Sequence, residues 1–165
     1  MRTKVLSLIV DNTSGVLSRV SGMFSRRGYN IDSLTVGVTQ DPKYSRMTVV
    51  VTGDDKILSQ IKNQLNKLED VVSITELKDG ESVCRELVLL KVKANNEQRQ
   101  QIITLANVYR ANIVDVSPDS LMVEMTGTIS KIQAFINLLD GFEILELVRT
   151  GITGLTRGLY DNANN

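Results

Sequence analysis

The sequence predicts an α+β protein made of two tandem ferredoxin-like domains, each with the element order βαββαβ. Three observations support this fold class. The 165 residues suffice for one domain or for two small ones. Apolar runs of strand length alternate with stretches of helical periodicity. The same order of elements then occurs a second time, and the pair Asn30-Ile31 of the first half recurs as Asn112-Ile113 in the second.

The predicted strands of the first half are runs rich in β-branched and apolar residues, each bounded by turn-forming residues. They are residues 5–10, 31–38, 47–51 and 71–77. The second and third of these runs are close in sequence and are separated by a short polar stretch that contains Pro42, which predicts a hairpin.

Two amphipathic helices are predicted between these strands. The first follows Ser14, its expected N-cap, and ends before Gly28. The second begins at Asp54 and Asp55. Apolar residues recur at helical spacing in both, so each helix is expected to bury one face. They are Val16, Leu17, Val20, Met23 and Phe24 in the first helix and Ile57, Leu58, Ile61, Leu65 and Leu68 in the second.

The second half repeats this order. Its predicted strands are residues 87–92, 113–116, 121–125 and 144–148. Its helical stripes are Ile102, Ile103, Ala106 and Tyr109, and then Ile129, Ile132, Phe135, Ile136 and Leu139. The predicted boundaries are 1–77 for the first domain, 78–83 for a linker, 84–158 for the second domain and 159–165 for a flexible tail. The glycine-rich stretch 151–158 is expected to lie along a surface.

The composition excludes several classes of function. Lysine plus arginine (19) equals aspartate plus glutamate (19), so no net charge attracts a polyanion such as nucleic acid. The chain has no histidine, which excludes serine-histidine and cysteine-histidine catalysis and most zinc sites. Its one cysteine, Cys84, fits a reducing compartment, so we expect a cytoplasmic protein. The first apolar run is too short for a membrane span.

RNA-recognition domains share the βαββαβ order, so this class needs its own test. Such domains stack bases on aromatic residues of their central strands. Residues 5–10 and 47–51, which form the predicted central strands, contain no aromatic residue. RNA binding is therefore not expected.

Residues 11–15 join the first strand to the first helix and are the best candidate for a ligand-binding loop. The free amide groups of the first helical turn favour an anion such as a carboxylate or phosphate. Gly15 lacks a Cβ that would block a ligand, and Asn12 offers both a donor and an acceptor. The alternative is an ordinary capping turn without a ligand, because such turns use the same residue types.

Asn30 follows the turn at Gly28, and we expect the fold to bring it near the first loop, although asparagine is also common in turns. The second half has residues 93–97 in place of the glycine-containing loop, so a ligand site is expected in the first half. Arg19, together with the arginines that follow the first helix, is most simply explained as favourable charge near a helix C-terminus.

Three stretches carry a specific family resemblance, namely residues 11–20, 24–36 and 45–48. With them, the chain closely resembles the small regulatory subunits of acetohydroxyacid synthase, also called acetolactate synthase, from the first strand to Gly158. The resemblance implies an N-terminal ACT domain and a C-terminal ACT-like domain. It also implies a subunit without catalytic activity that joins and activates a large catalytic subunit and conveys feedback inhibition by valine in branched-chain amino acid biosynthesis.

The resemblance further implies that valine binds between paired ACT domains of a homodimer. The matching positions are Asn12, Gly15, Val16 and Leu17 on one side and Asn30 and Ile31 on the other. It implies no cofactor in this chain, whereas thiamine diphosphate, magnesium and FAD are expected in the catalytic subunit. No nucleic-acid or membrane partner is implied. The main departure is Asp11, where many relatives have glutamate, and the alternative function is a stand-alone amino-acid sensor or small enzyme.

Overall fold

A computed structural model describes residues 1–159 of the protein, which form two compact units. The first unit contains Met1–Cys84 together with residues 152–159, and the second is Arg85–Gly151. Of the predicted flexible tail, residues 160–165 lie outside the described part of the chain. Residues 152–158, which the sequence prediction placed in the second domain, belong to the first unit.

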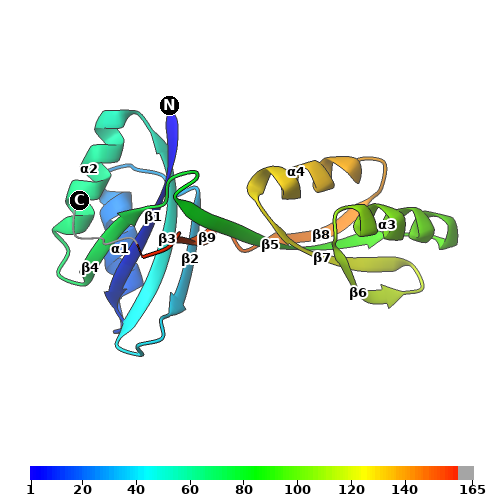
Figure 1. The fold of residues 1–165 in the computed structure, drawn as a ribbon, viewed down its shortest axis with the longest axis horizontal. Helices are drawn as coiled ribbons and strands as arrows, with labels where there is room; N and C mark the ends of the chain where they lie inside the picture. The colour runs from blue at the N-terminus through cyan, green and yellow to red at the C-terminus, as the bar shows by residue number, and fades with distance from the viewer. Residues whose placement is uncertain (160–165) are drawn as a thin grey trace. The chain divides into compact units, whose positions relative to one another are not determined.

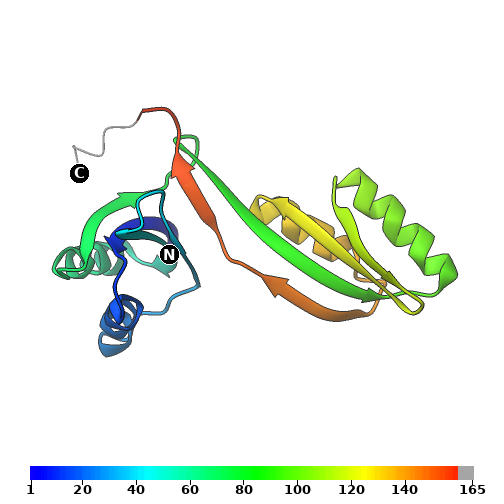
Figure 2. The same ribbon diagram turned by 90° about the horizontal axis from the view of Figure 1, so that it is seen from below.

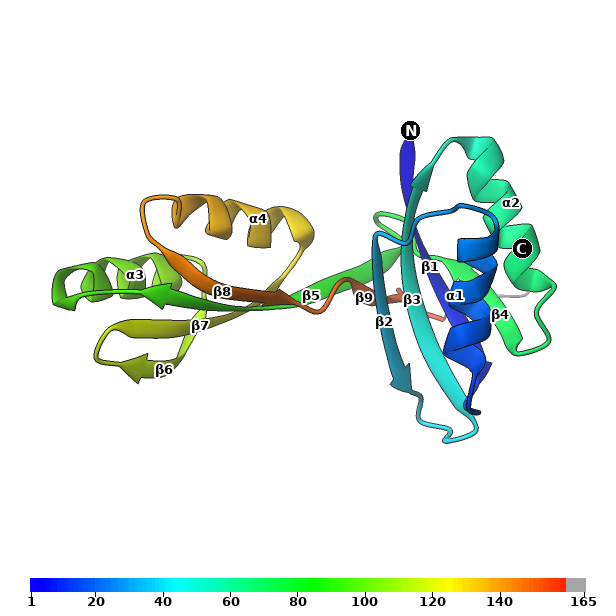
Figure 3. The same ribbon diagram turned by 180° about the vertical axis from the view of Figure 1, so that it is seen from behind.

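The first unit has the predicted βαββαβ order. Its elements are β1 (Arg2–Asp11), α1 (Val16–Arg26), β2 (Ser33–Val38), β3 (Tyr44–Gly53), α2 (Asp55–Asn66) and β4 (Val71–Glu76). The strands form one antiparallel sheet in the order β2-β3-β1-β4, which leaves β2 and β4 at its edges. Both helices cover the same face of this sheet (Figure 1, Figure 3). This ferredoxin-like arrangement confirms the predicted fold class.

Alternation along the strands creates the core of the first unit. Successive strand side chains point to opposite faces, so Leu6, Leu8 and Val10 of β1 all face the helices and are buried. The helices contribute apolar stripes to the same core, as their spacing predicted, except that Leu17 of the first stripe is 48% exposed. The fully buried residues among them are Val16, Val20, Met23 and Phe24 of α1 and Leu58, Ile61 and Leu65 of α2.

The C-terminal segment of the described chain packs against the first unit. Strand β9 (Thr153–Thr156) pairs with β5 (Ser82–Lys93), beside which it runs in Figure 2. Ile152 is buried, and its carbonyl accepts a hydrogen bond of 3.2 Å from the Thr35 hydroxyl on β2. A side chain at Gly154 would lie 2.5 Å from the Val83 carbonyl oxygen, so only glycine allows this approach. The stretch expected to lie along a surface therefore contains a paired strand.

The second unit repeats the fold. It is built from most of β5, with α3 (Asn96–Val108), β6 (Asn112–Ser117), β7 (Ser120–Gly127), α4 (Ile129–Leu138) and β8 (Ile144–Arg149). The strand order is β6-β7-β5-β8, and both helices cover one face of the sheet (Figure 1). Strand β5 starts at Ser82, earlier than predicted, because pairing with β9 extends it into the predicted linker, residues 78–83.

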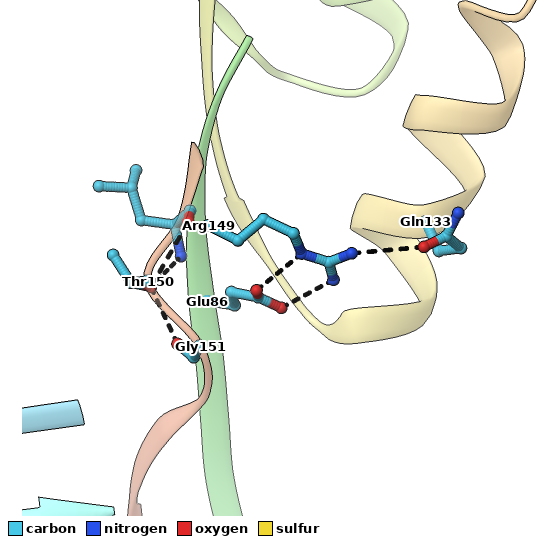
Figure 4. A network of polar contacts seen from close by, with 6 residues as sticks. Glu86, Gln133, Arg149, Thr150 and Gly151 are labelled. Atoms are coloured by element: carbon cyan, nitrogen blue, oxygen red, sulfur yellow. Dashed lines mark hydrogen bonds and ion pairs between the residues drawn. The ribbon is translucent and has the colours of Figure 1, made fainter. Parts of the chain in front are cut away.

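A charged pair joins the two strands that begin and end the second unit. Arg149 on β8 donates from Nε to Glu86 Oε1 at 2.8 Å and from Nη2 to Oε2 at 3.0 Å (Figure 4). Arg149 also donates from Nη1 to Gln133 Oε1 on α4, in a longer hydrogen bond of 3.4 Å. The hydrogen bonds from its guanidinium to Glu86 raise the pKa of Arg149, although desolvation opposes this. Glu86 is only 5% exposed, so this arginine neutralises a buried carboxylate on the central strand.

We predict that the substitution Arg149→Met destabilises the second unit by about 2 to 4 kcal/mol, because it leaves the Glu86 carboxylate buried without a partner. Lys91→Met is the matched control. It breaks a salt bridge of 3.0 Å to Glu146, whose side chain is exposed, and should cost less than about 1 kcal/mol. Native-state hydrogen exchange of the β7 amides measures both changes. Equal stability of the two variants would show that Glu86 needs no partner.

Candidate functional site

The loop between β1 and α1 ends in a glycine with a left-handed backbone. Gly15 is the N-cap residue of α1, with φ 86° and ψ −8°, and no side chain accepts a bond from the first turn. The expectation that Ser14 caps this helix is therefore wrong. The first helical residue is Val16, so Gly15 rather than Ser14 takes the cap position. The amide groups of this first turn have no capping acceptor.

The other three helices of the described chain begin differently. Each has a side chain that accepts a backbone hydrogen bond from the third helical residue, which is the usual way of satisfying these amides. The capping residues are Asp54 for α2, Asn95 for α3 and Thr128 for α4. The start of α1 is thus the one at which the first-turn amides are left open to an anion.

Asn12 fastens the loop to the hairpin between β2 and β3. Its backbone N–H donates to the Lys43 carbonyl at 2.8 Å, and its Nδ2 donates to the Pro42 carbonyl at 2.9 Å. Its Oδ1 accepts a bond of 3.1 Å from the Ser45 hydroxyl. Each polar atom of the side chain therefore has one partner within the chain, which leaves the second N–H of Nδ2 and the second lone pair of Oδ1 for a ligand.

A salt bridge lies on the other side of the loop. Arg19 donates from Nε to Asp70 Oδ2 at 2.6 Å and from Nη2 to Asp70 Oδ1 at 3.1 Å. These hydrogen bonds hold the pKa of the Asp70 carboxyl below its usual value and raise the pKa of Arg19, although desolvation acts in the opposite direction on both. The pair is therefore ionised at neutral pH.

The assignment of Arg19 to the C-terminal end of the helix is not what the structure shows. A helical side chain leans toward the N-terminus of its helix, so Arg19 reaches back over Gly15, four residues earlier. A Cβ at Gly15 would lie only 2.8 Å from Arg19 Nη1. The sequence analysis did not identify Arg19 and Asp70 as a pair, because 51 residues separate them.

The apolar residues assigned to the site have different surroundings. Val16 is 4% exposed and packs in the core, so its side chain does not line the loop surface. Leu17 is 48% exposed and can contact a ligand. Ile31 is partly buried and packs at the edge of the same core. Asn30 is exposed and donates from Nδ2 to Asp32 Oδ1 at 3.1 Å.

Asn12 and Asn30 lie at opposite ends of the sheet within one chain. In the strand register, Asp11 is paired with Tyr44, whereas Ser33 is paired with Val50 at the other end of β3. The expectation that the fold brings Asn30 near the first loop is therefore wrong for a single chain. The reason is that α1 runs back along the antiparallel sheet before β2 begins.

The equivalent helix start of the second unit has a side-chain cap. At the start of α3, Asn95 and Gln98 form a reciprocal capping box that uses the helix amides. A cleft of about 340 Å³ lies there, lined by Lys93, Asp119 and Glu143 among others, with Lys93 and Glu143 paired at 3.6 Å. The two units therefore differ at this position, since the helix start is uncapped in the first and capped in the second.

Within residues 1–159, no helix is long and apolar enough to cross a membrane. No group of three or more histidine, cysteine, aspartate or glutamate side chains in the same range is placed to hold a metal ion.

The two halves of the chain match two family descriptions. Residues 6–73 match the "AHAS small subunit-like ACT domain", and residues 85–158 match the "small subunit of acetolactate synthase". Among curated relatives, the probable acetolactate synthase small subunit of Methanothermobacter thermautotrophicus is 49% identical and covers 94% of each chain. The isozyme 3 small subunit of Escherichia coli is 45% identical over 94% of this chain and 96% of its own.

A solved structure agrees with these sequence matches. The crystal structure of the acetolactate synthase small subunit from Thermotoga maritima has a TM-score of 0.88 and 41% sequence identity, and the match covers 96% of this chain and 99% of that chain. The similarity thus extends over nearly the whole length in both sequence and fold, which confirms the resemblance seen in the sequence. The chain belongs to the family of acetolactate synthase small subunits.

Proposed function

We propose that this protein is the regulatory subunit that activates the thiamine-diphosphate-dependent catalytic subunit of acetolactate synthase and conveys feedback inhibition by valine. The observation that carries the proposal is the uncapped start of α1 at Gly15, which presents open amide groups to an anion. The relatives are named small subunits of acetolactate synthase, which supports a catalytic subunit as the partner of this chain. On this proposal thiamine diphosphate, magnesium and FAD bind to the catalytic subunit, and the complex acts in the cytoplasm.

The chemistry of the loop suits a free amino acid. The α-carboxylate would accept bonds from the first-turn amides of α1, where the helix dipole favours negative charge. Asn12 would orient the polar end of the amino acid through the second N–H of Nδ2 or the second lone pair of Oδ1, while its present bonds hold the side chain in place. Leu17 is exposed beside the loop and would contact the branched side chain, together with Ile31 of a second copy.

A second copy of the chain would complete the site. Strand β2 is an edge of the first sheet, and such an edge offers unpaired backbone groups to a partner strand. If two β2 strands pair antiparallel about a twofold axis, the loop end of one sheet comes beside the opposite end of the other. That end carries Asn30 and Ile31. The two groups of site residues, separated in one chain, would then face each other across the homodimer.

We predict that the double substitution Val36→Lys and Val38→Lys yields a monomer that no longer binds valine. Both residues are exposed on β2, and edge lysines block strand pairing. Val72→Lys is the control, because Val72 is exposed on β4 at the other edge, and this variant should remain dimeric. Sedimentation velocity and calorimetry with valine test both variants. A wild-type chain that is strictly monomeric at micromolar concentration and still binds valine tightly would contradict the proposed dimer site.

We also predict that Gly15→Asp abolishes valine inhibition of the reconstituted enzyme. The new carboxylate would compete for the amides that hold the carboxylate of valine and would repel it. Because Gly15 has φ 86°, the substitution should also lower stability by about 1 kcal/mol, which thermal melts would register.

Gly22→Ala is the matched control for this substitution. Gly22 lies inside α1, and a Cβ there meets only Arg26 Nη1 at 3.5 Å, an ordinary contact. This variant should be inhibited like the wild type and gain a little helix stability. A folded Gly15→Asp subunit that activates the enzyme and is inhibited at the wild-type valine concentration would remove Gly15 from the site.

A further inference from the structure

We infer that Arg19 and Asp70 are positioning residues, which hold the loop of residues 12–15 in the shape that receives the effector. The inference rests on the proposed function for the identity of the effector. Its structural part, that the salt bridge orders this loop, can be measured without any ligand.

The loop needs an external support because its own sequence provides little order. Glycine loses more backbone freedom on folding than other residues, and Gly15 must be held in one left-handed conformation. The other three helices gain order at their start from a side-chain cap, but such a cap also occupies an amide. A support from outside the first turn orders the loop and leaves its amides free for a ligand.

The contacts of Asp70 link the three elements that meet at the loop. Its carboxylate accepts two bonds from Arg19 of α1, while its backbone carbonyl accepts a bond of 2.9 Å from the Asp11 N–H at the end of β1. Asp70 itself directly precedes β4. The backbone N–H of Arg19 donates to the Gly15 carbonyl at 3.0 Å. The end of β1, the start of β4 and the first turn of α1 are therefore fixed to one another.

Two features favour glycine at position 15, namely its left-handed backbone and the guanidinium beside it. Nη1 lies above Gly15 so closely that any Cβ there would displace it. Nε and Nη2 hold Asp70 in a two-point contact, so a displaced guanidinium would also lose its fixed orientation. Gly15 thus serves the salt bridge as well as the backbone turn.

The effect of this pair should be local. The Arg19 side chain is 51% exposed and that of Asp70 is 18% exposed, and ion pairs with so much solvent contact add little to global stability. Order in a short loop is different, because fixing a few groups before a ligand arrives lowers the entropy that binding must remove. We therefore expect a change in effector affinity that is larger than the change in melting temperature.

The test uses the full chain with the substitutions Arg19→Gln and Asp70→Asn, singly and together. The control is Glu76→Gln, which breaks the salt bridge of 3.2 Å between Lys4 and Glu76 in the same unit. The backbone amides of Asp11, Asn12 and Arg19 are hydrogen-bonded at this loop, and their hydrogen exchange should become about tenfold faster in each variant but not in the control. The double variant should resemble either single variant, because both lose the same contact.

The functional measurement is a valine titration of the reconstituted enzyme. The valine concentration for half inhibition should rise about tenfold in the Arg19 and Asp70 variants, the factor expected when one or two groups must be ordered on binding. The melting temperature should change no more than in Glu76→Gln. Arg19→Lys should restore part of the affinity, since it keeps the charge but not the two-point contact.

The outcomes separate this inference from the proposed function. Unchanged exchange of the loop amides would overturn the inference whether or not valine binds. A looser loop with unchanged valine inhibition would overturn it too, because loop order would then not matter for the effector. If the wild-type chain neither binds valine nor conveys inhibition, the proposed function fails, and the exchange data alone decide whether the salt bridge orders the loop.

Discussion

The open amide groups at the start of α1 leave the loop of residues 12–15 to be held by contacts from outside the helix. Backbone N–H groups are obligatory donors, and a helix normally satisfies the first of them with a side chain. Here Gly15 occupies the cap position and has no side chain to offer. The loop is instead held from outside, by the hydrogen bonds of Asn12 to the hairpin on one side and by the Arg19–Asp70 salt bridge on the other.

The antiparallel sheet imposes the second constraint. Because the chain returns through α1 to the opposite end of the sheet before β2 starts, the loop and the Asn30 region must lie at opposite ends of one unit. A site that needs both can form only between copies. The exposed edge strand β2 provides a means of pairing them, so dimer formation and effector binding would depend on the same strand.

The two units show how one fold acquires different properties at equivalent places. The start of α3 is closed by a capping box, and a bidentate pair between Glu86 and Arg149 stabilises the central and edge strands of its sheet. In the first unit the loop is left open, and its salt bridge lies beside that loop. The same element order therefore carries an uncapped helix start in one half and a capped one in the other.

The sequence by itself determined the element order, the buried faces and the family, because these depend on patterns within a few residues. The alternation of Leu6, Leu8 and Val10 and the cap at Asp54 are such local signals. Only the tertiary structure decided that Gly15 rather than Ser14 caps α1, that Leu17 of the apolar stripe is exposed, and that Arg19 pairs with Asp70. These features depend on which distant segments come into contact in the fold, and neither hydrophobic periodicity nor residue type predicts such contacts.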